Sequence, residues 1–151
     1  MRSLGCWQVL LVLSAIIAPA AVAADDADDL KLMAGTWKPT AADLGGNKID
    51  AMVLENASFV VEGENYTVSV NDFTEKGTFK LDPKKEPKAL DFFPTQGNNN
   101  GKTFLCVYKI DGDVLTICYS LDGTTRPENF EPLSNTLLFV KYERVKNPQS
   151  P

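Results

Sequence analysis

The chain of 151 residues contains no histidine and only three cysteines. Histidine is the commonest general base near neutral pH and the commonest transition-metal ligand, so its absence excludes the usual forms of both sites. Of the cysteines, Cys6 lies in a segment that we expect to be removed. The two that remain, Cys106 and Cys118, are too few for a closed tetrahedral zinc site. We therefore predict no metal site and no cofactor.

A surplus of positive charge is also lacking, because 15 lysines and arginines stand against 20 acidic residues and give a net charge of −5. Proteins that bind nucleic acid need a basic stripe to neutralise phosphates, so we do not expect a nucleic-acid partner. Ser134 and the threonines have no histidine to activate them, and Asp111 and Asp113 lie on an expected solvent-exposed turn. No catalytic residue is indicated, and we predict that the protein is not an enzyme.

The first 24 residues have the order of a secretory signal peptide: Arg2, an apolar stretch, and the small residues Ala21 and Ala23 before the expected cleavage point. An uncleaved membrane anchor is the competing interpretation, because the apolar character extends over almost the length of a spanning helix. Pro19 and the acidic residues that follow favour cleavage. We predict an exported protein, periplasmic or extracellular, that retains no membrane span and is a monomer.

Beyond residue 35, apolar and polar residues alternate, which is typical of half-buried strands because successive side chains point to opposite faces. Turn residues separate the runs into about eight short strands, a number that can close into a barrel. Before them we expect an acidic linker at residues 25–29 and one helical turn at residues 30–34, and between strands a helical segment at residues 50–56. The inward-facing positions are Trp37, Phe59, Val61, Tyr66, Val68, Val70, Phe79, Leu81, Leu90, Phe92, Cys106, Tyr108, Ile110, Leu115, Ile117, Tyr119, Leu138, Val140 and Tyr142.

The fold class is therefore mainly β: an antiparallel, about eight-stranded barrel with a short N-terminal helical turn. We assign the barrel domain to residues 30–146 and a disordered tail to residues 147–151. Eight-stranded barrels are either filled by their own side chains or hold one small ligand. The short strands and many aromatic residues favour a filled or nearly filled interior. The inward tyrosines complicate this expectation, because polar groups inside an apolar cavity also orient ligands.

Gly35, Thr36 and Trp37, at the start of the first strand, resemble the G-x-W motif of lipocalins. The segments 77–83, 87–91, 108–113, 115–119 and 126–127 follow in an order that resembles a small secreted domain family of planctomycete bacteria, and the similarity covers residues 32–146. The resemblance implies a lipocalin-like barrel and a bacterial envelope setting, and it implies no activity. In lipocalins an arginine near the end of the last strand lies over the motif tryptophan. By this resemblance, and because Arg144 shares the inward parity of its strand, we predict that Arg144 stacks on Trp37.

Two cysteines in an oxidising compartment suggest a disulfide. The alternation argues against it, because it places Cys106 opposite Tyr119 and turns Cys118 to the outer face. A slip of one residue would pair the cysteines and would also expose the apolar set of one strand, which a buried sheet resists. We predict no bridge. We interpret Asp111-Gly112-Asp113 as a hairpin turn, since the further ligands of a calcium loop are missing.

Two functional hypotheses remain. The first is a non-catalytic envelope module that binds a protein or polymer through its loops. Its best candidate surface is residues 122–132, which combine Arg126, Glu128 and Phe130. The second is a carrier of a small apolar ligand inside the barrel, where Tyr108 and Tyr119 are candidate contacts. We favour the first, and a cavity of roughly 300 Å³ or more would favour the second.

Overall fold

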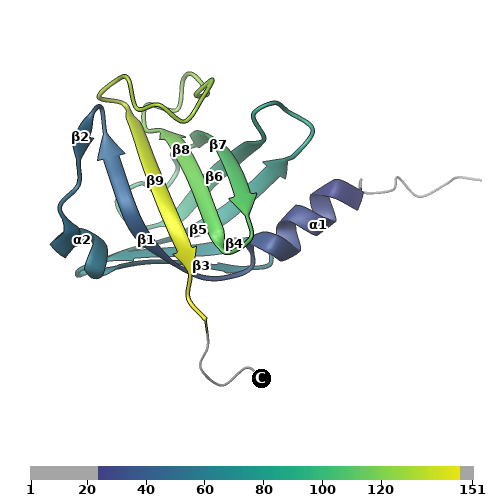
Figure 1. The fold of residues 1–151 in the computed structure, drawn as a ribbon, viewed down its shortest axis with the longest axis horizontal. Coiled ribbons are helices and arrows are strands. Elements are labelled where there is room, and N and C mark those ends of the chain that lie inside the picture. The colour runs from purple at the N-terminus through teal and green to yellow at the C-terminus, as the bar shows by residue number, and fades with distance from the viewer. Residues whose placement is uncertain (1–23, 147–151) are drawn as a thin grey trace, which may run out of the picture.

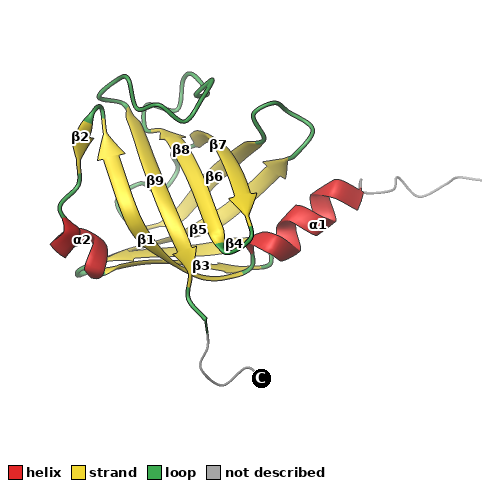
Figure 2. Cartoon of the chain, in the orientation of Figure 1, coloured by secondary structure: helices red, strands yellow, loops and turns green. Residues whose placement is uncertain are grey.

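The structure, a computed structural model, describes residues 24–146 and consists mainly of β-strands (Figure 2). The predicted signal peptide, apart from Ala24, and the predicted tail at residues 147–151 lie outside the described residues. The elements in chain order are α1 (Ala24–Met33), β1 (Gly35–Leu44), β2 (Asn47–Lys48), α2 (Ala51–Glu55), β3 (Ala57–Glu62), β4 (Asn65–Val70), β5 (Phe73–Asp82), β6 (Ala89–Gln96), β7 (Phe104–Asp111), β8 (Val114–Ser120) and β9 (Leu137–Arg144).

Strands β1 and β3 to β9 form a closed antiparallel barrel (Figure 1). Each strand pairs with the next along the chain, and β9 closes the ring by pairing with β1. Closure leaves no exposed barrel edge, which protects the strands from pairing with another molecule. The two-residue strand β2 folds back on the end of β1 and is an addition to the ring. The predicted fold class is confirmed.

Alternation along the strands places the core inside the barrel, as predicted. All the positions inferred to face inward are buried or partly buried. The largest side chains, among them Trp37, Phe59 and Tyr108, are almost completely buried. The helical segment predicted at residues 50–56 is α2, which Asp50 caps by accepting a hydrogen bond from the backbone N–H of Met52 at 2.8 Å.

The predicted linker at residues 25–29 is an error, because the chain is helical from Ala24 onward and Asp29 is buried. Asp29 Oδ2 accepts hydrogen bonds from the Tyr108 hydroxyl at 2.7 Å and from Lys88 Nζ at 2.8 Å. These partners come from the barrel and hold α1 against one of its ends, so tertiary contacts rather than local apolar pattern order this segment. An acidic run shows no sign of such partners in the sequence.

Arg144 lies on Trp37, as predicted, and closes the barrel at the α1 end. Its guanidinium carbon is 4.2 Å from the centroid of the indole ring. The same group donates to the carbonyls of Leu32 and Ala34 at 2.5 and 2.6 Å, and pairs with Asp113 at 3.2 Å. The backbone of Gly35 has φ +127°, and a Cβ there would lie 2.9 Å from the guanidinium. The backbone conformation therefore favours glycine at this position, and a Cβ there would displace the Arg144 guanidinium.

The register of β7 and β8 confirms the prediction for the cysteines. Cys106 pairs with Tyr119 and Cys118 with Val107, so the two side chains are on opposite faces of the sheet, and both thiols are free. Cys118 is nevertheless fully buried. The outer face is covered here by residues 121–136, in which Pro127 is buried. Residues 111–113 form the predicted hairpin turn between β7 and β8.

Candidate functional site

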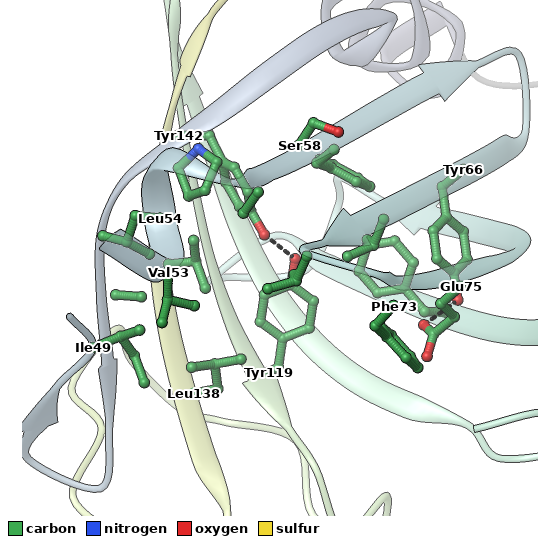
Figure 3. Close-up of a pocket in the computed structure, with 18 of the residues that line it drawn as sticks. Ile49, Val53, Leu54, Ser58, Tyr66, Phe73, Glu75, Tyr119, Leu138 and Tyr142 are labelled. Carbon is green, nitrogen blue, oxygen red and sulfur yellow. Dashed lines mark hydrogen bonds between the residues drawn. The ribbon is translucent and has the colours of Figure 1, made fainter. Parts of the chain in front are cut away.

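The barrel contains a cavity of about 290 Å³ at the end opposite α1. We call it the barrel cavity. It is lined by inward side chains of β1, β3 to β9 and by α2 (Figure 3). Figure 1 shows the two helices on opposite sides of the barrel, and α2 is the helix whose residues Val53 and Leu54 line the cavity. The interior is thus filled in one half and hollow in the other, so the expectation of a filled or nearly filled barrel is wrong for the half next to α2.

The uneven distribution of side-chain size along the strands explains the cavity. At the closed end the inward positions carry Trp37, Tyr108 and Leu115, which fill the space between the strands. At the other end the positions that line the cavity include Ala42 and Val70. These small side chains leave space between the aromatic side chains that also line the cavity, among them Phe73 and Tyr119.

Two tyrosine hydroxyls meet at the cavity wall. The hydroxyl oxygens of Tyr119 on β8 and Tyr142 on β9 are 2.8 Å apart (Figure 3). Burial raises the pKa of both phenols, so both remain protonated at neutral pH. Two hydroxyls that share one hydrogen bond have two protons, and the hydroxyl that accepts can donate its own proton to a ligand oxygen.

A buried carboxylate lies at another part of the wall. Glu75 on β5 is only 7% exposed. Its Oε1 accepts a hydrogen bond from the Tyr66 hydroxyl at 2.9 Å, and its Oε2 accepts one from Asn99 Nδ2 at 2.6 Å. Burial first, and then the hydrogen bond and negative charge of Glu75, raise the pKa of Tyr66. Figure 3 shows Glu75 and Tyr66 on the opposite side of the cavity from Ile49 and Leu54.

The exposed side chains that line the cavity are apolar. Ile49, Val53 and Leu54, from the β2–α2 connection and α2, line it together with Leu121. Val53 and Leu121 are each 37% exposed, and Met52 beside them is 70% exposed. An apolar ligand approaching this end would meet apolar side chains before it enters the barrel.

The residues predicted for a loop contact site lie elsewhere. Arg126 Nη2 pairs with Asp91 Oδ1 at 2.6 Å, and its Nη1 donates to the Cys106 carbonyl at 2.7 Å. Lys109 Nζ is 4.9 Å from the centroid of the Phe130 ring. Both contacts hold residues 121–136 on the outer wall of the barrel. Glu128 is exposed.

The two tyrosines named as ligand contacts are separated. Tyr119 lines the cavity, whereas Tyr108 is at the closed end, bound to Asp29. Our reading of the sequence missed Glu75 and Asn99. Glu75 shares the inward parity of Phe79, but Gly77 occupies the inward position between them, so the apolar alternation was recognised only from Phe79 onward. Extending the alternation back to Phe73 would have placed an acidic side chain inside the barrel.

Within residues 24–146, no three His, Cys, Asp or Glu side chains are grouped so that they could hold a metal ion. No helix in this part of the chain is long and apolar enough to cross a membrane. Comparison of the chain with protein families, curated proteins and solved structures finds no match. The case for function therefore depends on the geometry of the barrel cavity.

Proposed function

We propose that the protein binds one small, mainly apolar molecule in the barrel cavity. The observation that carries this proposal is a cavity of about 290 Å³ with a mostly apolar lining, which includes the exposed apolar side chains of Val53 and Leu121. Its volume is close to the lower end of the range for small-molecule sites, roughly 300 to 1,000 Å³. Such sites combine apolar walls with a few polar groups that orient the ligand, and here the hydroxyls of Tyr119 and Tyr142 and the carboxylate of Glu75 supply them.

The phenols at the cavity are suited to binding a ligand through hydrogen bonds. The three phenols at the cavity, Tyr66, Tyr119 and Tyr142, have raised pKa values, which makes them poor general bases at neutral pH. We infer that they act as hydrogen-bond partners for a ligand that leaves unchanged.

The alternative function, recognition of a protein or polymer through residues 122–132, gains less support from the contacts of that segment. The Arg126 guanidinium is occupied by Asp91 and by backbone carbonyls, and Phe130 lies under Lys109. Side chains that attach a loop to its own barrel are less available to a partner. Export, a bacterial envelope setting and the planctomycete resemblance remain parts of the proposal. N-terminal sequencing of the natural protein tests the first, with a start after Ala23 or Ala24 as the expected result.

A fluorescence titration with the neutral apolar probe N-phenylnaphthylamine tests the proposed function. We expect saturable, blue-shifted emission with one probe per chain. Val70→Trp should weaken binding about tenfold or more, because Val70 lines the cavity and an indole would occupy it. The matched control is Thr67→Trp, on the outward parity of the same strand, which should bind like the parent. Absence of saturable binding, or equal loss in both variants with the fold intact by circular dichroism, would contradict the proposal.

A further inference from the structure

We infer that the ligand of the barrel cavity is a cation, an apolar molecule with a protonated amine that binds the Glu75 carboxylate. This inference depends on the proposed function, and it adds the chemical class of the ligand. Its basis is a buried carboxylate on the cavity wall whose partners are all neutral.

The hydrogen-bond partners of Glu75 do not include a positively charged group. Each of its two oxygens accepts one hydrogen bond, from a phenol and from an amide, and both of these partners are neutral. Among the residues that the structure describes, no Lys or Arg nitrogen lies within 4.0 Å of it. The nearby ammonium of Lys102 donates to Asn99 Oδ1 at 3.1 Å instead. Asn99 therefore lies between the Lys102 ammonium and the Glu75 carboxylate, and the two charged groups make no direct contact.

A carboxylate that is removed from water without a positive partner is costly, and neutral hydrogen bonds offset only part of the cost. A carboxylate has about four lone-pair positions, and the two bonds to Tyr66 and Asn99 leave positions unused. A protonated amine would supply both missing elements, a positive charge and N–H donors, in a charge-assisted hydrogen bond. The rest of such a ligand would lie against the apolar wall.

The same feature determines which ligands the cavity rejects. An apolar molecule with a carboxylate or sulfate head would bring a second negative charge into a space with a buried negative charge, and the two would repel. Arg126 and Arg144, the two arginines among the described residues, are held outside the cavity, by Asp91 and at the closed end. The cavity should therefore select amines over acids of the same shape.

Isothermal titration with three probes that share one apolar body tests the inference: naphthylethylamine, naphthylethanol and naphthylacetic acid. With the parent protein near neutral pH, the amine should bind about tenfold or more tightly than the alcohol, and the acid most weakly. In Glu75→Gln the preference for the amine over the alcohol should fall to less than about threefold, while affinity for the alcohol is retained. The control Glu64→Gln removes the same charge from an exposed turn at the closed end and should keep the parent's ranking.

The parent protein alone can overturn the inference, so the test does not depend on whether Glu75→Gln folds. Equal affinity for the amine and the alcohol, or tightest binding of the acid, would reject the cationic ligand and leave the proposed function standing. A preference for the amine that persists in Glu75→Gln would also reject it, because the charge would then be recognised elsewhere. If neither N-phenylnaphthylamine nor any of the three probes binds, the proposed function and the inference are both wrong.

Discussion

At the scale of single residues, Arg144 joins three segments at the closed end of the barrel. Its guanidinium lies on Trp37, donates to the carbonyls of Leu32 and Ala34, and pairs with Asp113. The indole of Trp37 in turn donates to the Met33 carbonyl at 2.8 Å. These contacts tie α1 and the start of β1 to the last strand.

Arg144→Ala should therefore lower the free energy of unfolding by about 2 to 4 kcal/mol, because it removes a cation–π contact and leaves partly buried carbonyls without a donor. Urea denaturation followed by circular dichroism measures the change. Lys141→Ala, at an exposed position of the same strand, is the matched control and should change stability by no more than about 0.5 kcal/mol. Equal effects of the two substitutions would mean that the stacked geometry contributes nothing.

The buried thiols make stability depend on alkaline pH. Burial raises the pKa of Cys118 from its ordinary value of 9.0 to about 11, and it also raises the pKa of Cys106. Below pH 9 the Cys118 thiol is protonated in both states and contributes no pH dependence. Between pH 9 and 11 it ionises in the unfolded chain and stays neutral in the folded protein, so stability falls as pH rises.

We expect the parent protein to lose about 1 kcal/mol more than Cys118→Ala between about pH 8 and about pH 10, as measured by urea denaturation at each pH. The comparison uses the difference between two pH values, so it is independent of the cost of the substitution itself. Parallel losses in the two proteins would show that this thiol ionises equally in the folded and unfolded states.

The sequence predicted the positions of residues that follow from strand alternation. It did not predict positions that depend on contacts with residues distant in the sequence. The contact between Trp37 and Arg144 was predicted because strand alternation turns Arg144 inward and because residues 35–37 resemble the G-x-W motif. Asp29 was assigned to a solvated linker because the neighbouring sequence gives no indication that Tyr108 and Lys88 lie next to it in the fold.

At the scale of elements, the segment at residues 121–136 packs on the outer wall of β6, β7 and β8. Arg126 anchors it by pairing with Asp91 and donating to carbonyls of Leu90 and Cys106. The sequence predicted a charged and aromatic contact surface here, because an exposed binding loop and a loop that packs on its own domain have similar compositions. Only the position of Asp91 on the adjacent wall distinguishes them.

Arg126→Ala should lower the free energy of unfolding by about 1 to 3 kcal/mol, since it leaves Asp91 and two carbonyls without their donor. Glu128→Ala, two residues away at an exposed position, should be nearly neutral in the same denaturation experiment. If Arg126→Ala leaves stability unchanged and instead abolishes capture of a specific partner protein, the loop hypothesis would be preferred to a role in folding.

The strands themselves were largely predictable, because a period of two and turn residues mark a half-buried strand wherever it lies. The register of β7 and β8 followed from keeping both apolar sets inside. The start of β5 was missed because its inward positions 75 and 77 carry Glu75 and Gly77, which interrupt the apolar alternation in the sequence. That short error hid Glu75, the residue on which the proposed ligand class depends.

At the scale of the whole molecule, the barrel is divided into a filled half and a hollow half. Alternation predicts which side chains point inward, but it does not give the volume that they leave between them. The cavity depends on how side chains from several strands pack together, such as Ala42, Ala57 and Val140 on the adjacent strands β1, β3 and β9. That information is in the closed structure and not in any one segment of the sequence.

Native mass spectrometry of the protein purified from the organism that makes it tests the central claim most directly. We expect a species heavier than the chain by the mass of one small molecule, and this molecule should be released by organic extraction and identified as an apolar amine. Its loss from Val70→Trp and its retention in Thr67→Trp would place it in the barrel cavity. A chain that carries no small molecule and is found only in complex with another protein would contradict the account.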